Sequence, residues 1–147
     1  MGRRLMFVDA SALVAIINQE PGWKELAKRL SDVQNACFVS PLVRFEAALA
    51  VARAAATAGG ASARPTPDIL AVARELVDSL VAELGADEIS ISGPIGEKAL
   101  DAAMTYGKAI GHPADLNFGD CFAYACAKAC GVGLIYKGDD FARTDLA

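Results

Sequence analysis

The sequence predicts an α/β fold in which a small, mainly parallel sheet lies between layers of helices. Short apolar runs with the length of buried strands alternate with longer segments in which apolar residues recur every three or four positions. No two runs are joined by the two-residue turn that closes a β-hairpin. Alternating strands and helices without hairpins are typical of parallel sheets. At 147 residues the chain is expected to form one domain.

The first half of the chain is predicted to hold two strands and three helices. A short apolar run ends at Asp9, and the small residues after it open a helix. Ser40 is a suitable N-cap, and Pro41 fits the first helical position, where its missing N–H is harmless. The predicted elements are a strand at 5–8, helices at 11–18 and 23–30, a strand at 37–39 and a helix at 41–57.

The second half continues the alternation after a segment rich in glycine and alanine. Residues 59–65 are predicted to be a flexible loop between two helices, because a domain linker at this point would leave two very small domains. The remaining predicted elements are a helix at 67–84, a strand at 88–91, a helix from 94 to Gly107 or Gly111, a helix at 117–130 and a strand at 132–136.

Composition indicates a globular chain without a strong electrostatic preference for nucleic acid. Hydrophobic residues make up 54% of the sequence, and no apolar run approaches the roughly 18 residues of a membrane span. The basic start is followed by too short an apolar run for a signal peptide, so a cytoplasmic location is expected. A net charge of −4 does not indicate a basic binding face. A divalent metal and a local basic cluster can still offset acids beside a phosphate, and the candidates are Arg3, Arg4, Arg44, Lys137 and Arg143.

The four cysteines are interpreted as buried free thiols. Three of them fall largely on the apolar face of one predicted helix, where disulfide geometry is not to be assumed. There is no Cys-x-x-Cys pair, and His112 is the only histidine, which argues against a structural zinc site. Any bound metal is therefore expected to have oxygen ligands.

Acidic residues stand where the predicted strands end. Asp9 follows the first strand, Asp120 lies one turn into the helix that precedes the last strand, and Asp139 follows that strand. The carboxyl ends of parallel strands lie on one edge of a sheet, where ligands collect. Glu46 projects from a mostly apolar helix face, where an unpaired charge is costly, so a positive partner is expected for it.

Each acid also has an ordinary structural explanation. Asp9 can cap a helix, Asp120 can form a capping box with Asn117, and acids are common in turns after strands. Their joint arrangement favours a single site. Two like charges about 4 Å apart repel by about 4 kcal/mol at an effective dielectric constant of 20, and a divalent cation reverses that sign. Oxygen ligands alone suit Mg²⁺ or Mn²⁺.

With these residues in view, nearly the whole chain resembles the PIN-domain ribonucleases of the VapC toxin type. The third and fourth matching segments are specific and occur in the expected order, whereas the first alone is weak. The segments are Phe7-Val8-Asp9-Ala10-Ser11-Ala12-Leu13, Arg44-Phe45-Glu46-Ala47, Asn117-Phe118-Gly119-Asp120-Cys121-Phe122-Ala123-Tyr124-Ala125 and Tyr136-Lys137-Gly138-Asp139-Asp140-Phe141-Ala142-Arg143-Thr144-Asp145.

The resemblance implies a PIN-like three-layer α/β/α fold and a site for Mg²⁺ or Mn²⁺. It further implies an RNA substrate, a homodimer and a cognate antitoxin protein whose tail covers the acidic groove. Ser11 and Asn117 would support the ligands or hold waters. The implied metal and catalytic acids are Asp9, Glu46 and Asp120, with Asp139 as the fourth and Asp140 as a close alternative.

The leading functional hypothesis is a metal-dependent endoribonuclease, the toxin of a type II toxin–antitoxin pair. One alternative is a non-catalytic PIN-like module that acts only by binding a protein. Another is an aspartate-based phosphatase, which usually needs a second aspartate two residues after the first, where this sequence has Ser11.

Overall fold

A parallel sheet of four strands, in the order β3-β2-β1-β4, forms the centre of the molecule. In this computed structural model, which describes residues 4–60 and 64–147, Met6 pairs with both Cys37 and Gly133. Both neighbours of β1 therefore run in its direction, as the absence of hairpin signals predicted. The strands are β1 (Met6–Val8), β2 (Cys37–Val39), β3 (Asp87–Glu88) and β4 (Gly133–Ile135).

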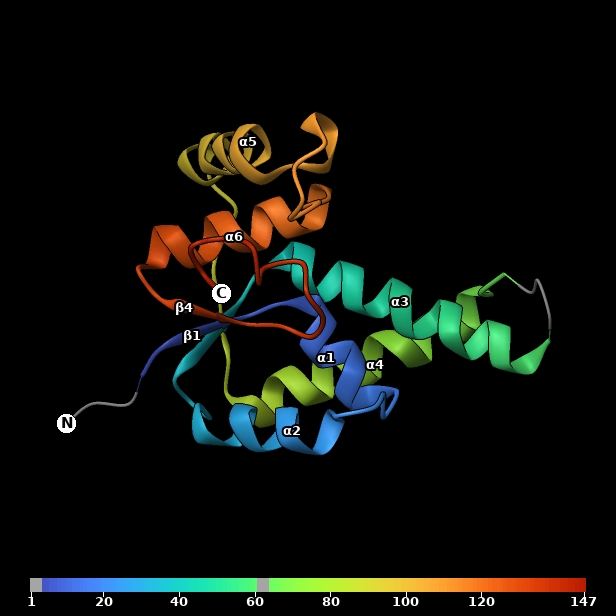
Figure 1. The fold of residues 1–147 in the computed structure, drawn as a ribbon. Coiled ribbons are helices and arrows are strands. Elements are labelled where there is room, and N and C mark those ends of the chain that lie inside the picture. The colour runs from blue at the N-terminus through green and yellow to red at the C-terminus, as the bar shows by residue number, and fades with distance from the viewer. Residues whose placement is uncertain (1–3, 61–63) are drawn as a thin grey trace.

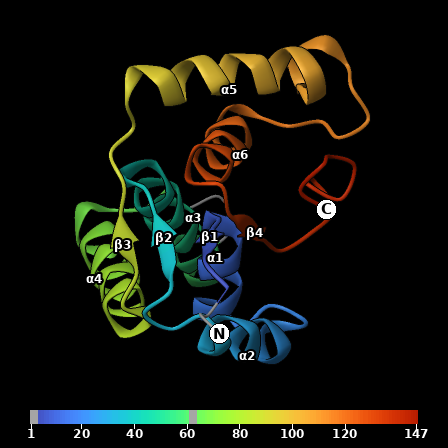
Figure 2. The same cartoon turned by 90° about the vertical axis from the view of Figure 1, so that its left-hand side faces the viewer.

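Helices cover both faces of this sheet, which confirms the predicted three-layer arrangement. In Figures 1 and 2, α5 and α6 lie on one side of the sheet and α1, α2 and α4 on the other. α3 starts at the carboxyl edge of the sheet and pairs with α4 in a hairpin that extends beyond it. The helices are α1 (Ala10–Ile17), α2 (Trp23–Asp32), α3 (Pro41–Gly59), α4 (Pro67–Leu84), α5 (Gly93–Tyr106) and α6 (Phe118–Cys130), with a short 3₁₀ helix η1 (Lys108–Ile110).

Most of these helices start at a capping residue that the sequence signals. In each case a side-chain oxygen accepts a hydrogen bond from a backbone N–H of the first turn, a group that has no partner within the helix. α3, α4 and α5 also carry proline in the first turn. The caps are Asp9, Ser40, Thr66, Ser92 and Asn117.

The core lies between the sheet and the helices on either side. Phe7 and Val8 of β1 are completely buried, as expected for the central part of a parallel sheet covered on both faces. Of the four thiols, Cys37, Cys121 and Cys126 lie in this core and Cys130 is partly buried. No helix within the described ranges is long and apolar enough to cross a membrane.

Two predicted boundaries are wrong in an informative way. The third strand was expected at 88–91, but its pairing with β2 starts at Asp87. The last backbone hydrogen bond between the two segments runs from Ile89 N to Val39 O, at 2.9 Å. β3 cannot extend further along β2, because β2 ends at Val39 and Ser40 already caps α3. α3 continues to Gly59 rather than Thr57. The predicted loop at 59–65 includes residues 61–63, which lie outside the described residues.

Candidate functional site: an acidic cavity at the carboxyl edge of the sheet

Asp9 leaves the end of β1 and caps α1, so its carboxylate is buried at the edge of the sheet. Its Oδ2 accepts hydrogen bonds from the backbone N of Ser11, at 3.0 Å, and from Ser11 Oγ, at 2.5 Å. Burial raises the pKa of Asp9, and the hydrogen bonds from Ser11 and Ala10 oppose that rise. Asp9 therefore caps α1, as the sequence allowed. The capping bonds hold its carboxylate at the edge of the sheet where ligands bind in parallel sheets.

Ser11 also joins the two strands whose ends form the site. Its Oγ accepts a hydrogen bond from the backbone N of Lys137, just after β4, at 2.9 Å. The hydroxyl thus connects Asp9 to the segment that carries the last acids of the chain. The negative charge of Asp140 adds to the rise in the pKa of Asp9.

Asp120 approaches the same place from the first turn of α6. The capping box is formed: Asn117 N donates to Asp120 Oδ2 at 3.1 Å, and Asp120 N donates to Asn117 Oδ1 at 2.9 Å. Burial raises the pKa of Asp120 to about 7, the hydrogen bond from Asn117 opposes the rise, and the charges of Asp9, Asp140 and Glu46 add to it. A carboxylate with this pKa favours a proton or another positive charge beside it.

Glu46 reaches the site from α3, and Gly119 makes room for it. A Cβ atom added to Gly119 would collide with the carboxylate group of Glu46, so the side chain lies directly against the backbone of α6. Burial and the charge of Asp9 raise the pKa of Glu46 to about 7. The positive partner expected from sequence is not found among the described residues, because none of the ion pairs there includes Glu46.

These side chains line one cavity of about 560 Å³. Three of the predicted acids are brought together there by three different elements, and Asp140 and Glu20 line the cavity with them. Asp139 and Asp140 are both exposed, and of the two only Asp140 lines the cavity. The acids that line the cavity are Asp9, Glu20, Glu46, Asp120 and Asp140.

Two cations line the cavity as well. Lys137, a candidate from sequence, lies 3.7 Å from Glu20 through its Nζ atom. Arg53 was not singled out, although it stands seven residues after Glu46 on the same helix, a spacing that places two side chains on one face. Arg44 lies elsewhere: its guanidinium pairs with Asp78 of α4 and, at 2.9 Å, with Glu88 of β3. Arg3 lies outside the described residues.

The donor chemistry of the cavity fits Mg²⁺ or Mn²⁺. Carboxylate oxygens are the ligands that these hard cations prefer, and Gly119 leaves one of them, Glu46, a place against α6. Within residues 4–60 and 64–147, however, no three His, Cys, Asp or Glu side chains stand close enough to hold one ion as they are. The hydrogen bonds at the helix caps use Oδ2 of Asp9 and Oδ2 of Asp120, so the Oδ1 atom of each carboxylate is the oxygen that these caps leave for an ion.

The raised pKa of Glu46 predicts how the metal-free protein responds to pH. Its carboxyl has a higher pKa in the folded chain, about 7 against an ordinary 4.5, so ionisation between these pH values destabilises the folded state. In EDTA at pH 8, Glu46→Gln is expected to raise the free energy of unfolding by about 1–2 kcal/mol, allowing for solvent screening. Near pH 4 the two proteins should unfold alike. Thermal unfolding across this pH range tests the prediction. If Glu46→Gln stabilised the protein equally at every pH, ionisation of Glu46 would not be the cause of the stabilisation.

Comparison with protein families places this chain in a known class. The sequence model of the PIN-domain family matches residues 6–146 of this chain. The chain therefore belongs to the PIN-domain family.

Several proteins similar to this chain are VapC ribonucleases. A VapC ribonuclease of Rhizobium meliloti (strain 1021) is 55% identical over 144 residues, which cover 97% of this chain and 99% of that protein. Ribonuclease VapC42 of Mycobacterium tuberculosis is 33% identical, with 96% of both chains covered. Among solved structures, VapC20 of Mycobacterium tuberculosis, described as a Sarcin-Ricin loop cleaving toxin, has the same fold, with a TM-score of 0.67 at 13% identity over 97% of this chain and 96% of that one. A toxin–antitoxin complex from Klebsiella pneumoniae matches with a TM-score of 0.62 at 17% identity, covering 95% of this chain and 92% of that one.

Proposed function

We propose that this protein is a metal-dependent endoribonuclease that hydrolyses RNA phosphodiester bonds, and that it is the toxin of a type II toxin–antitoxin pair. The observation that carries the proposal is the cavity in which Asp9, Glu46 and Asp120, from three separate elements, lie together with Asp140. The full-length similarity to VapC ribonucleases supports the choice of RNA as substrate.

In this proposal Asp9, Glu46, Asp120 and Asp140 hold Mg²⁺ or Mn²⁺. We assign Asp140 rather than Asp139 as the fourth metal ligand, because Asp140 lines the cavity and its charge raises the pKa of both Asp9 and Asp120. When bound, the cation supplies positive charge to the acids, lowers the pKa of water and stabilises the charge of a phosphoryl group in transit. The chain itself keeps the carboxylates in position by the bonds from Ser11 to Asp9 and from Asn117 to Asp120.

The two cations of the cavity suit the phosphates of an RNA strand. The chain as a whole carries a charge of −4, so attraction to RNA has to be local. Arg53 lies two helical turns from Glu46 and forms no ion pair with another described residue. We assign Arg53 and Lys137 to the phosphates on either side of the cleaved linkage.

The proposed partners follow from the same class of protein. One structural neighbour is a toxin–antitoxin complex, and we propose that a cognate antitoxin covers the acidic cavity of this chain. A basic group inserted among carboxylates with raised pKa values would relieve their repulsion, which gives such a partner a physical reason to bind there. We further propose that the toxin acts as a homodimer in the cytoplasm, where its RNA substrates are.

Cleavage of RNA by the purified chain, with and without divalent metal, tests the proposal. We expect new RNA ends to appear with Mg²⁺ or Mn²⁺ and to disappear when EDTA removes the metal, because the acids alone repel the phosphate. Mapping the ends on total bacterial RNA would show which linkages are cut. Cleavage that continues unchanged in EDTA would contradict the role of the metal, and no cleavage of any RNA with either metal would contradict the proposed activity.

A further inference from the structure

Two exposed phenyl rings flank the acidic cavity. The side chains of Phe45 and Phe118 are 62% and 70% exposed, whereas Phe7 and Phe141 lie in the core. Both exposed rings line the acidic cavity, and each also lines a second, more apolar cavity next to it. Exposed aromatic rings beside a functional site call for an explanation, because burial of such a ring is favourable.

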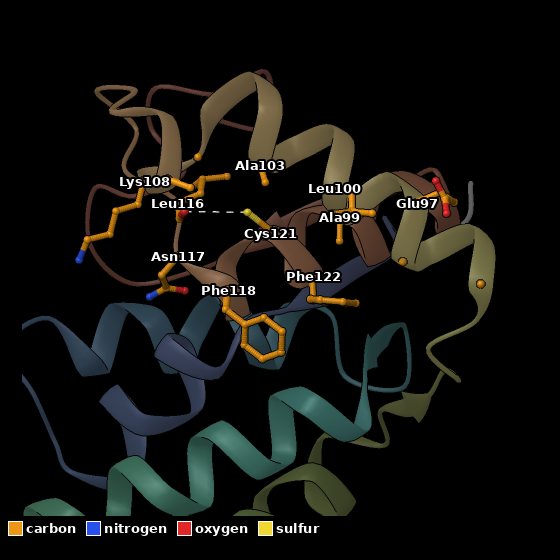
Figure 3. Close-up of a pocket in the computed structure, with 14 residues that line it drawn as sticks. Glu97, Ala99, Leu100, Ala103, Lys108, Leu116, Asn117, Phe118, Cys121 and Phe122 are labelled. Atoms are coloured by element: carbon orange, nitrogen blue, oxygen red, sulfur yellow. Dashed lines mark hydrogen bonds between the residues drawn. The ribbon is translucent and has the colours of Figure 1, made fainter.

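The same helical turns position the rings and the acids. Phe45 directly precedes Glu46 on α3, and Phe118 stands two residues before Asp120 on α6. Figure 3 shows the Phe118 ring projecting from the first turn of α6 away from α5. Phe122 meets it edge to face, with 5.2 Å between ring centroids, and so supports its orientation. The backbone that positions each ring therefore also positions an acid.

Next to each ring, on the side away from the acidic cavity, there is space for a flat apolar group. Beyond Phe118 lies a cavity of about 790 Å³ between α5 and α6, and small residues of α5 such as Ala99 and Ala103 leave it open (Figure 3). Beyond Phe45 lies a smaller cavity of about 320 Å³ between α3 and α4, where apolar walls from Leu70 and Val77 meet the charged side chains of Arg44, Arg74 and Asp78.

The order of these surfaces matches the chemistry of a nucleotide chain. A phosphodiester joins two nucleosides. When the phosphate lies at the acids, one base therefore extends toward each of the two neighbouring cavities. Along the surface, the apolar cavity beside Phe118 is followed by the acidic cavity and then by the smaller cavity beside Phe45, which has apolar and charged walls. An apolar face of a protein partner would instead meet five carboxylates and two cations in its middle, at a cost in desolvation.

We propose that Phe45 and Phe118 stack against the two nucleobases that flank the cleaved linkage. This inference rests on the proposed function for the position of the phosphate. Stacking on an aromatic ring requires bases that are not paired, and it tolerates any base because all have a π-face. The two rings therefore select unpaired RNA. Asn117 stands at the rim shared by the acidic and the larger apolar cavity; its Oδ1 caps α6, and its side-chain NH2 group is a donor for a base edge.

A cycle of protein and substrate changes tests the stacking. The substrate is a short single-stranded RNA that the protein cleaves at a mapped linkage, with the base on either side removed in turn to leave an abasic nucleotide. Phe45→Leu and Phe118→Leu are each expected to raise KM about 5- to 150-fold with little change in kcat. On the RNA that lacks the matching base, the same substitution should have no further effect, because the stack is already lost.

Met104→Ala is the matched control, since Met104 is 66% exposed on α5 and lines neither the acidic nor the apolar cavities. Its KM should stay at the wild-type value. Unchanged KM in both phenylalanine variants, or equal effects on intact and abasic RNA, would overturn the proposal. So would a change in sedimentation of Phe45→Leu or Phe118→Leu with unchanged KM, because it would identify the rings as a protein interface.

Binding separates failure of this inference from failure of the proposed function. Single-stranded RNA carrying 2-aminopurine loses fluorescence when that base stacks on a phenyl ring, whether or not the strand is cut. Quenching by the intact chain that is lost in the leucine variants would support stacking even if no cleavage occurred. Cleavage without such quenching would support the nuclease and overturn the stacking.

Discussion

Asp120→Asn is expected to lower the rate of RNA cleavage about 10³-fold or more, while the protein remains folded. The substitution removes a charge from the cavity at the position where Asp9, Asp140 and Glu46 all act on the carboxyl. The amide oxygen of asparagine still accepts the hydrogen bond that Asn117 N donates to Asp120, so α6 keeps its cap. Single-turnover cleavage, thermal unfolding and calorimetric titration with Mn²⁺ measure activity, stability and metal affinity separately.

The neighbouring acids provide a control for this result and decide the identity of the fourth acid. Asp139→Asn should retain activity, because Asp139 does not line the cavity. Asp140→Asn should lose activity and Mn²⁺ affinity together. If Asp139→Asn lost as much activity as Asp140→Asn, the assignment of Asp140 would be wrong, and full activity in Asp120→Asn would remove the mechanism.

Gly119→Ala is expected to lower cleavage about 10²-fold by displacing one side chain. The new methyl group would occupy the place of the Glu46 carboxylate, which would have to move away from the α6 backbone. Replacing glycine by alanine within a helix also adds about 0.5–1 kcal/mol of stability, which offsets part of the steric cost. The rate of cleavage should therefore fall strongly, while the melting temperature changes little.

Two further variants test whether Gly119 acts through Glu46. Combined with Glu46→Ala, the Gly119→Ala change should cost nothing more, since the side chain it displaces is gone. Gly59→Ala, near the end of α3 where an added Cβ would meet open space, should leave cleavage unchanged. An additive loss in the double variant would mean that Gly119 serves the site in another way than by making room for Glu46.

Local chemistry accounts for the part of this fold that could be predicted. The buried run before Asp9, the Ser40-Pro41 start of α3 and the Asn117 cap of α6 each depend on residues within a few positions, and all appear in the structure. β3 was placed too late because its length depends on where β2 ends, which is a property of the neighbouring strand. Asp9 and Asp120 were predicted as site residues because they stand beside strand ends, where ligands collect in parallel sheets, and Glu46 because a charge on an apolar helix face conflicts with burial.

By itself the sequence determined the layered parallel fold, the capped helices and an acidic site with oxygen donors, because periodicity, capping and charge placement act over short stretches of chain. Only the tertiary structure decided that Asp140 rather than Asp139 faces the cavity, that Gly119 makes room for Glu46 and that Arg53, Phe45 and Phe118 surround the acids. These relations depend on how α3 packs against α6 and on the bond from Lys137 to Ser11. Such contacts join residues far apart in the chain, and their geometry follows from packing of the whole core rather than from any local pattern.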